Sequence, residues 1–147
     1  MTKAFIIIKQ VTWSEAQANL RLIRTSVFIK EQQVEPDFEW DELDVSAVHL
    51  LALVDKQLVA CLRIIDYKKI GRMAVLKPWR RFGIGKAMLM KAIEICRKHS
   101  SQSIFLSAQT HAIGFYVNAG FKQISQEYTD VNIAHVDMQL LLNDNRD

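Results

Sequence analysis

The residues best suited to chemistry lie in a glycine-punctuated turn between an apolar, strand-like segment and a helix-like one. Arg80, Gly83 and Gly85 have the spacing Arg-x-x-Gly-x-Gly within residues 71–89. The first amides of a helix have no partner inside it, and the helix dipole favours negative charge near them. Glycine lets a ligand approach the backbone closely and tolerates a positive φ. The pattern therefore favours a binding site for an anion such as phosphate.

Two common phosphate-binding motifs are absent from this turn. A Walker A loop needs a Ser or Thr hydroxyl for magnesium after its Gly-Lys, but here Ala87 follows Lys86. The dinucleotide fingerprint needs a third glycine where this chain has Met88. On the two glycines alone, an ordinary strand-to-helix turn stays an equal alternative.

The turn resembles the coenzyme A signature of the GNAT superfamily of N-acetyltransferases, Gln/Arg-x-x-Gly-x-Gly/Ala after a Val-rich strand. Residues 115–121 read Phe-Tyr-Val-Asn-Ala-Gly-Phe and resemble the Phe-Tyr-x-x-x-Gly-Phe that closes the superfamily's last helix. The two motifs occur in the expected order, and the likeness extends over residues 48–141. Residues 24–49 also resemble a small uncharacterised bacterial-type subgroup, from which no substrate follows.

The resemblance implies that acetyl-CoA is the cosubstrate and that no metal is needed. The pyrophosphate would sit on the amides of residues 81–86, and the pantetheine arm would lie along the backbone of residues 74–76. Gln109 follows a second strand-like segment, where cofactor contacts are common in the superfamily, but a plain loop residue is equally expected there. The implied cofactor-binding residues are Ala74, Val75, Leu76, Arg80, Arg81, Phe82, Gly83, Ile84, Gly85, Lys86, Gln109 and Tyr116.

Acetyl transfer to an amine also needs an acid for the leaving thiolate and a base for the amine. Tyr116 of the second motif is the predicted general acid, because a phenol with a pKa of about 10 keeps its proton at neutral pH. Its alternative role is that of a core aromatic. Glu31 is the predicted base, because it ends the first helix-like segment within the subgroup likeness. Glu42, Asp44 and His49 are further candidates, each with a structural role as its alternative.

Residues 31–47 are rich in Asp and Glu and bear on the acceptor. Most of this stretch is predicted to be solvated surface. Its functional interpretation is an acidic rim that attracts a cationic amine. The predicted reaction is transfer of an acetyl group to a primary amine, either a small molecule or a peptide, by direct attack in a ternary complex.

Two other functions stay open. Arg24, Phe28 and Arg63 in their contexts resemble acyl-homoserine lactone synthases, which share the architecture and use acyl carriers. The intact glycine turn argues against that enzyme. The other alternative is a domain that binds acetyl-CoA without turnover.

The elements that position these residues begin with an apolar first strand over residues 4–11. Ser14 and Gln17 have the pattern of a capping box, which predicts a helix that reaches to about Glu31. Apolar residues recur at helical spacing along this segment, so the helix is expected to pack on a sheet.

Two strand-like runs, residues 48–54 and 57–66, meet at Asp55-Lys56, which predicts a tight hairpin. Residues 68–76 continue the meander. A helix follows the glycine turn, and residues 104–107 form a short buried strand.

The last predicted elements are a helix capped by Thr110 that ends at Gly120, and an antiparallel pair of residues 121–125 and 134–141. The order predicts a single domain over residues 1–147 in the α/β (α+β) class. The resemblance implies the GNAT fold, a mixed, mostly antiparallel sheet of about six to seven strands with helices on both faces. Its two central parallel strands splay apart and admit the pantetheine arm.

Composition narrows the remaining possibilities. The formal net charge of +3 is modest and spread along the chain, which argues against a nucleic-acid surface. The first apolar run is too short to span a bilayer, so we expect a cytoplasmic protein without a membrane contact. Cys61 and Cys96 are expected to be buried thiols and not a disulfide, and no metal-binding spacing occurs. A homodimer is compatible with the sequence.

Overall fold

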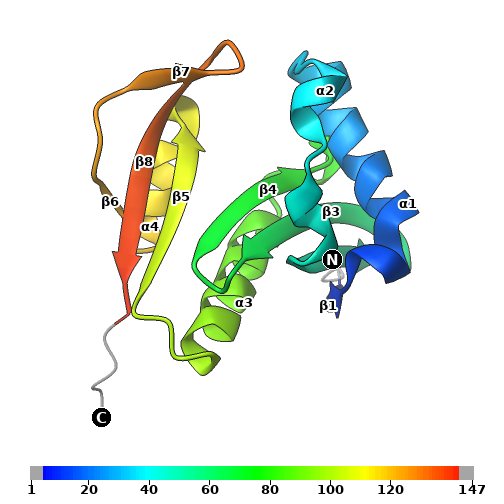
Figure 1. Ribbon diagram of the computed structural model, residues 1–147. Coiled ribbons are helices and arrows are strands. Elements are labelled where there is room, and N and C mark those ends of the chain that lie inside the picture. Colours follow the sequence, from blue (N-terminus) through cyan, green and yellow to red (C-terminus); the bar gives the residue numbers. More distant parts are fainter. Residues whose placement is uncertain (1–4, 143–147) are drawn as a thin grey trace.

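One mixed sheet of eight strands organises residues 5–142, the part of the chain that the computed structural model describes (Figure 1). The strand order is β1-β2-β3-β4-β5-β8-β6, with β7 paired to β8. All of these pairs are antiparallel except β4 with β5. The strands are β1 (Ile6–Val11), β2 (Val48–Val54), β3 (Gln57–Ile65), β4 (Lys69–Val75), β5 (Ser103–Gln109), β6 (Lys122–Gln123), β7 (Tyr128–Asp130) and β8 (Ile133–Leu141).

Helices cover both faces of the sheet. α3 packs on one face, where Met88 and Cys96 belong to the larger hydrophobic core, and α1 packs on the other, where Leu20 and Cys61 belong to a smaller core. Both cysteines are buried free thiols, as predicted. The helical segments are α1 (Trp13–Arg24), the π-helix η1 (Thr25–Glu31), α2 (Pro36–Glu39), α3 (Ile84–Lys98), α4 (Ile113–Asn118) and the 3₁₀ turns η2 (Glu42–Val45), η3 (Lys77–Trp79) and η4 (Thr110–Ala112).

The predicted class is confirmed: the fold is α/β, with a mostly antiparallel sheet between helices. The sheet has eight strands where the sequence predicted about six to seven. The additional strand is β7, which is only three residues long, whereas β6 lies within the predicted strand of residues 121–125. Segments this short carry no detectable alternation of apolar and polar residues.

β4 and β5 are the parallel strands at the centre of the sheet, and they diverge. Lys69 opposite Phe105 is the pair that joins them, at the end where β4 begins. Beyond it the two strands separate, which Figure 1 shows as the gap beside β4. The facing edges of both strands therefore leave backbone N–H and C=O groups without a partner strand, as the splayed arrangement predicted.

The predicted hairpin between β2 and β3 is present. Asp55 and Lys56 both have positive φ, 50° and 70°, as a two-residue type I′ turn requires. This turn sets the antiparallel register of the two strands.

The start of α1 differs from the prediction. Thr12 is the N-cap: its hydroxyl accepts from the Glu15 amide at 3.1 Å, and the Glu15 carboxylate accepts from the Thr12 amide at 2.8 Å. The predicted capping pair, Ser14 and Gln17, has the same spacing two residues later, but both residues lie inside the helix. β1 ends at Val11, so the helix begins immediately after Thr12. Residue 4, the predicted start of the first strand, lies outside the described residues.

Thr110 does not cap α4. It begins the 3₁₀ turn η4, and α4 follows with Ala112 at its N-cap, where no side chain bonds the first amides. The helix ends at Asn118, and Gly120 with φ 102° completes the turn into β6. The chain therefore enters α4 through a 3₁₀ turn, without a side-chain cap.

Most residues of the acidic stretch are exposed, as predicted, but Glu39 and Asp44 are buried. Arg24 is 1% exposed and pairs with both, at 2.7 Å to Glu39 and 2.8 Å to Asp44. Its guanidinium also lies over the rings of Trp13 and Trp40. Hydrogen bonds to carboxylates and stacking on aromatic rings together compensate for taking this charge out of water.

Two more arginines complete the network on the β3 and β4 side. Arg63 contacts Asp44 at 3.1 Å and Asp41 at 2.8 Å. Arg72 contacts Glu39 at 3.0 Å and Asp41 at 3.2 Å. The loop that carries α2 and η2 is therefore fixed to α1 and to the sheet by charged groups. We call these six residues the arginine–carboxylate network: Arg24, Glu39, Asp41, Asp44, Arg63 and Arg72.

Asp44→Asn should lower the free energy of unfolding by about 3 kcal/mol, because it keeps the shape of the side chain but leaves Arg24 buried with less countercharge. Urea denaturation measures the change. Glu94→Gln is the control, since its pair with Lys91 is exposed and should contribute less than about 1 kcal/mol. Equal effects of the two variants would mean that the network is not a desolvated ion-pair cluster.

Candidate active site

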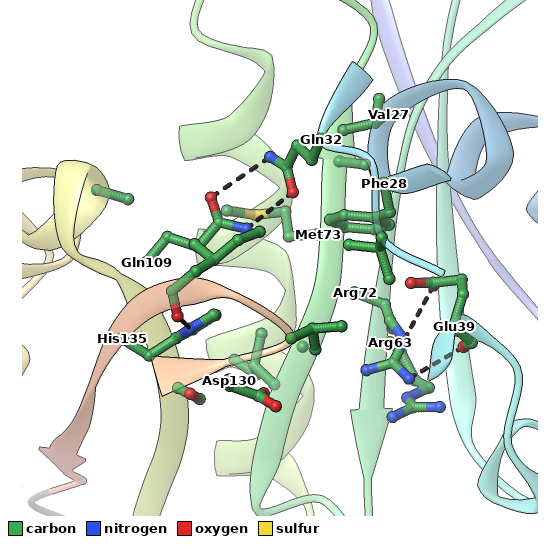
Figure 2. Close-up of a pocket in the computed structure, with 18 of the residues that line it drawn as sticks. Val27, Phe28, Gln32, Glu39, Arg63, Arg72, Met73, Gln109, Asp130 and His135 are labelled. Atoms are coloured by element: carbon green, nitrogen blue, oxygen red, sulfur yellow. Dashed lines mark hydrogen bonds and ion pairs between the residues drawn. The ribbon is translucent and has the colours of Figure 1, made fainter. Parts of the chain in front are cut away.

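A cleft of about 1000 Å³ opens where β4 and β5 separate. Residues from both sides of the gap line it, and Figure 2 shows Phe28 and Met73 on one wall, with Gln109 and His135 on the other. Gly85 and Arg80 of the glycine turn also line it. The cleft therefore connects the start of α3 with the opposite face of the sheet through the gap between the strands.

The glycine turn has the geometry of an anion site. Gly83 is the N-cap of α3 with φ 82°, a left-handed conformation, and no side chain bonds the first amides of the helix. A Cβ on Gly85 would lie 3.6 Å from Phe115 and 3.8 Å from Val75, which are ordinary contacts. Gly83 is therefore favoured by its backbone conformation, whereas a Cβ at Gly85 would meet no steric conflict within the protein.

Arg80 of the same turn is engaged with protein groups. Its Nε donates to the Val75 carbonyl at 2.9 Å, and its two terminal nitrogens hold the Glu31 carboxylate at 2.8 and 2.7 Å. The hydrogen bonds from Arg80 lower the pKa of Glu31. The structure thus brings together two predicted site residues, but as an ion pair that makes Glu31 a weaker base than a free glutamate.

The other predicted cofactor residues fall into two groups. One group lines the cleft: Ala74, Val75, Gly85, Gln109 and Tyr116. In the second group Arg81, Phe82 and Lys86 have exposed side chains, Ile84 is buried in the core, and the Leu76 amide donates to Val59 of β3. Within this second group, the amides of residues 81–86 and the exposed cations of Arg81 and Lys86 are suited to an anionic ligand, whereas the Leu76 amide is already engaged.

Tyr116 reaches the cleft from α4. Its ring packs edge-on against Phe115 at 5.1 Å and Phe121 at 5.9 Å between centroids. Burial raises the pKa of Tyr116 to about 12, with no charge or hydrogen bond contributing. The phenol therefore stays protonated at neutral pH and has a free O–H to donate, which fits the predicted acid role.

The further base candidates lie away from the cleft. Asp44 belongs to the arginine–carboxylate network, and Glu42 is exposed on η2. His49 is fully buried, its Nε2 donates to the Asp44 carbonyl at 2.9 Å, and burial lowers its pKa. A neutral histidine that stabilises a loop accounts for its position. None of the three lines the cleft.

Gln32 is a site residue that the sequence analysis missed. Its side-chain amide exchanges hydrogen bonds with that of Gln109, at 2.9 and 3.4 Å, and so joins the end of η1 to the end of β5 across the gap (Figure 2). His111 contacts the same Gln109 oxygen at 2.7 Å. This pairing is 77 residues apart in sequence, and no local pattern predicts it.

A polar group on the β5–β8 side was also missed. Ser107 and Gln109 alternate on β5, and His135 and Asp137 stand opposite them on β8. The Tyr128 hydroxyl bonds both Ser107 and Asp137. The alternation His135-x-Asp137 was visible in the sequence, but its position facing the cleft depends on a strand register that the sequence does not encode locally.

Comparison with known proteins identifies the family. A family model described as "Acetyltransferase (GNAT) domain" matches residues 14–142. The chain belongs to this family. It is 37% identical over 136 residues to YyaT of Bacillus subtilis, an uncharacterised protein, covering 88% of this chain and 91% of that protein.

Solved structures agree with this assignment. The chain resembles an acyl-CoA N-acyltransferase from Pseudomonas aeruginosa with a TM-score of 0.79 and 30% identity, covering 93% of this chain and 99% of the other. It shares the fold of the PaiA N-acetyltransferase from Thermoplasma acidophilum, solved with coenzyme A, at a TM-score of 0.68 and 19% identity, covering 94% and 99%.

Within residues 5–142, no helix is long and apolar enough to cross a membrane. The same residues contain no cluster of three or more His, Cys, Asp or Glu side chains arranged to hold a metal ion.

The ion pair predicts the titration of Glu31. Its carboxyl pKa should lie below the ordinary glutamate value, and Arg80→Gln should raise it, because the largest cause of the shift is the hydrogen bond from Arg80. Carbon NMR of the side-chain carboxyl against pH measures both values. Arg81→Gln is the matched control and should leave the pKa of Glu31 unchanged; an unchanged value in Arg80→Gln as well would show that the pair does not form in solution.

Proposed function

We propose that the protein is an acetyl-CoA-dependent N-acetyltransferase that transfers the acetyl group to a primary amine by direct attack in a ternary complex. The observation that carries the proposal is the continuous cleft, which links the uncapped start of α3 to Tyr116 through the gap between β4 and β5. Membership of the GNAT family supports the reaction class.

The residues of the cleft fit coenzyme A. The amides at the start of α3 would hold the pyrophosphate, since they lack a side-chain cap. The edge of β4 at Ala74 and Val75 would bond the pantetheine arm in the manner of an added strand. The fold is shared with an N-acetyltransferase that binds coenzyme A, which supports the same choice.

The chemistry asks for two proton transfers. Acetyl-CoA supplies the thioester, whose carbonyl carbon bonds to the amine nitrogen while its C–S bond breaks. Tyr116 donates its phenolic proton to the leaving sulfur. The amine must be neutral to react, which costs roughly 4.6 kcal/mol at pH 7 for an alkylamine with a pKa of about 10.4. A base in the cleft reduces this cost.

The acceptor side of the cleft is lined both by apolar residues, among them Phe28, Val34, Phe38 and Met73, and by charged ones such as Glu39, Arg63 and Arg72. The acidic rim contributes less charge than the sequence suggested, because three arginines pair with Glu39, Asp41 and Asp44. The choice of an amine acceptor therefore rests on the family.

The resemblance to acyl-homoserine lactone synthases has a structural explanation. Arg24 and Arg63 both serve the arginine–carboxylate network, and Arg24 does not line the cleft. The fold thus accounts for the two arginines, whereas Phe28 and Arg63 also line the cleft; the intact glycine turn favours the N-acetyltransferase reaction over the synthase reaction.

Gly83→Asp should weaken coenzyme A binding by at least about tenfold relative to Gly83→Asn, because the added carboxylate repels phosphate. Asn and Asp have nearly the same shape and both tolerate positive φ, so strain at this N-cap cancels in the comparison. Calorimetry and the rise in Tm with coenzyme A provide the readouts. Equal affinities in the two folded variants would place the pyrophosphate elsewhere.

Tyr116→Phe should lower kcat by about 100-fold and change the affinity for acetyl-CoA little, because only the transferable proton is lost. The measurement is free-thiol release with the best acceptor from a panel of amines and alcohols. Tyr67→Phe, outside the cleft, is the control and should leave kcat unchanged. Binding of acetyl-CoA without thiol release for any acceptor would identify a binding domain that does not turn over.

A further inference from the structure

His135 occupies a position in the cleft that the predicted chemistry leaves unused. It lies on β8 opposite Gln109 of β5, is 8% exposed and lines the cleft (Figure 2). Gln109 is also the residue through which η1 contacts the β5 side. His135 therefore stands beside the point where the gap between β4 and β5 meets the acceptor side.

The hydrogen bonding of His135 assigns its tautomer. Nδ1 lies 2.8 Å from the Ile133 carbonyl oxygen, and a carbonyl only accepts, so Nδ1 carries the proton. In the neutral ring Nε2 then holds the lone pair. No hydrogen bond within residues 5–142 involves Nε2. The Ile133 carbonyl thus orients the His135 ring, and Nε2 is left as a proton acceptor without a donor among residues 5–142.

The ring is also held in place. Tyr128 of β7 stacks on it, with centroids 6.1 Å apart and planes 20° from parallel. Tyr128 is fixed in turn by its hydrogen bonds to Ser107 and Asp137. A base whose orientation is fixed before the substrate arrives needs no rearrangement to accept the proton.

We propose that His135 is the general base that takes the proton from the acceptor amine at Nε2. As the N–C bond forms and the C–S bond breaks, the amine proton goes to Nε2 and the sulfur receives the proton of Tyr116. Glu31, the predicted base, has both carboxylate oxygens occupied by Arg80. This role rests on the proposed N-acetyltransferase function.

The charged and titratable groups around the ring are two carboxylates, a tyrosine and a histidine. The carboxylates belong to the strands packed against the ring, Asp130 to β7 and Asp137 to β8. Tyr128 is neutral at physiological pH, because burial and the hydrogen bond to Asp137 raise its pKa. His111 contacts the Gln109 oxygen.

The test compares His135→Gln with two controls in amine turnover across pH. His135→Gln should lower kcat/KM by about 100-fold and leave only the fall on the acidic side that protonation of the amine itself causes, since an amide cannot take a proton. Coenzyme A affinity should be unchanged. His99→Gln, at the end of α3 outside the cleft, should match wild type, and Glu31→Gln should keep the acidic limb. Added imidazole should restore part of the activity of His135→Ala.

A readout independent of turnover is nitrogen NMR of a dead-end complex with coenzyme A and the best amine. The Nε2 signal of His135 should shift on binding, while Nδ1 should stay bonded to the Ile133 carbonyl. If the wild type and His135→Gln acetylate amines at the same rate and with the same pH profile, His135 is not the base, and the proposed function still stands. A wild-type protein that binds coenzyme A and acetylates no amine overturns the proposed function and this role with it.

Discussion

The separation of β4 from β5 is the constraint on which the rest of the structure depends. A continuous parallel pair would satisfy every backbone group in the centre of the sheet and leave no passage through it. Here Lys69 and Phe105 pair and the strands then diverge, so the edges beyond them face a cleft. Such edges persist only where water or a ligand can meet the exposed N–H and C=O groups. The open edges and the glycine turn at the start of α3 therefore define one binding surface.

A sheet that is joined at one end needs other links to keep its two parts in position. The arginine–carboxylate network fixes the η2 loop to β3 and β4 on the first side, where Asp44 receives both Arg24 and Arg63. On the second side, β5 and β8 share a long antiparallel register. Gln32 and Gln109 connect the two sides across the gap with neutral amide hydrogen bonds. These bonds are individually worth only about 1 kcal/mol, so the width of the cleft can adjust to a ligand.

The sequence predicted the features that adjacent residues determine. It missed those that depend on contacts between residues far apart in the chain. The Asp55-Lys56 hairpin and the left-handed Gly83 were accessible because a few adjacent residues determine them. Glu39 and Asp44 looked like solvated surface because their arginine partners lie far along the chain. His135 was missed for a related reason: alternation along β8 places it on one face, but only the register against β5 aims that face at the cleft.

The division of roles between the two sides of the gap follows from Arg80. Its Nε binds the Val75 carbonyl and its fork binds Glu31, so one side chain connects the glycine turn, β4 and η1. That connection occupies both carboxylate oxygens of Glu31. The groups proposed to move protons, Tyr116 on α4 and His135 on β8, both belong to the second side. The proposed reaction would therefore require an acyl group held by the first side to reach an acid and a base that are fixed to the second.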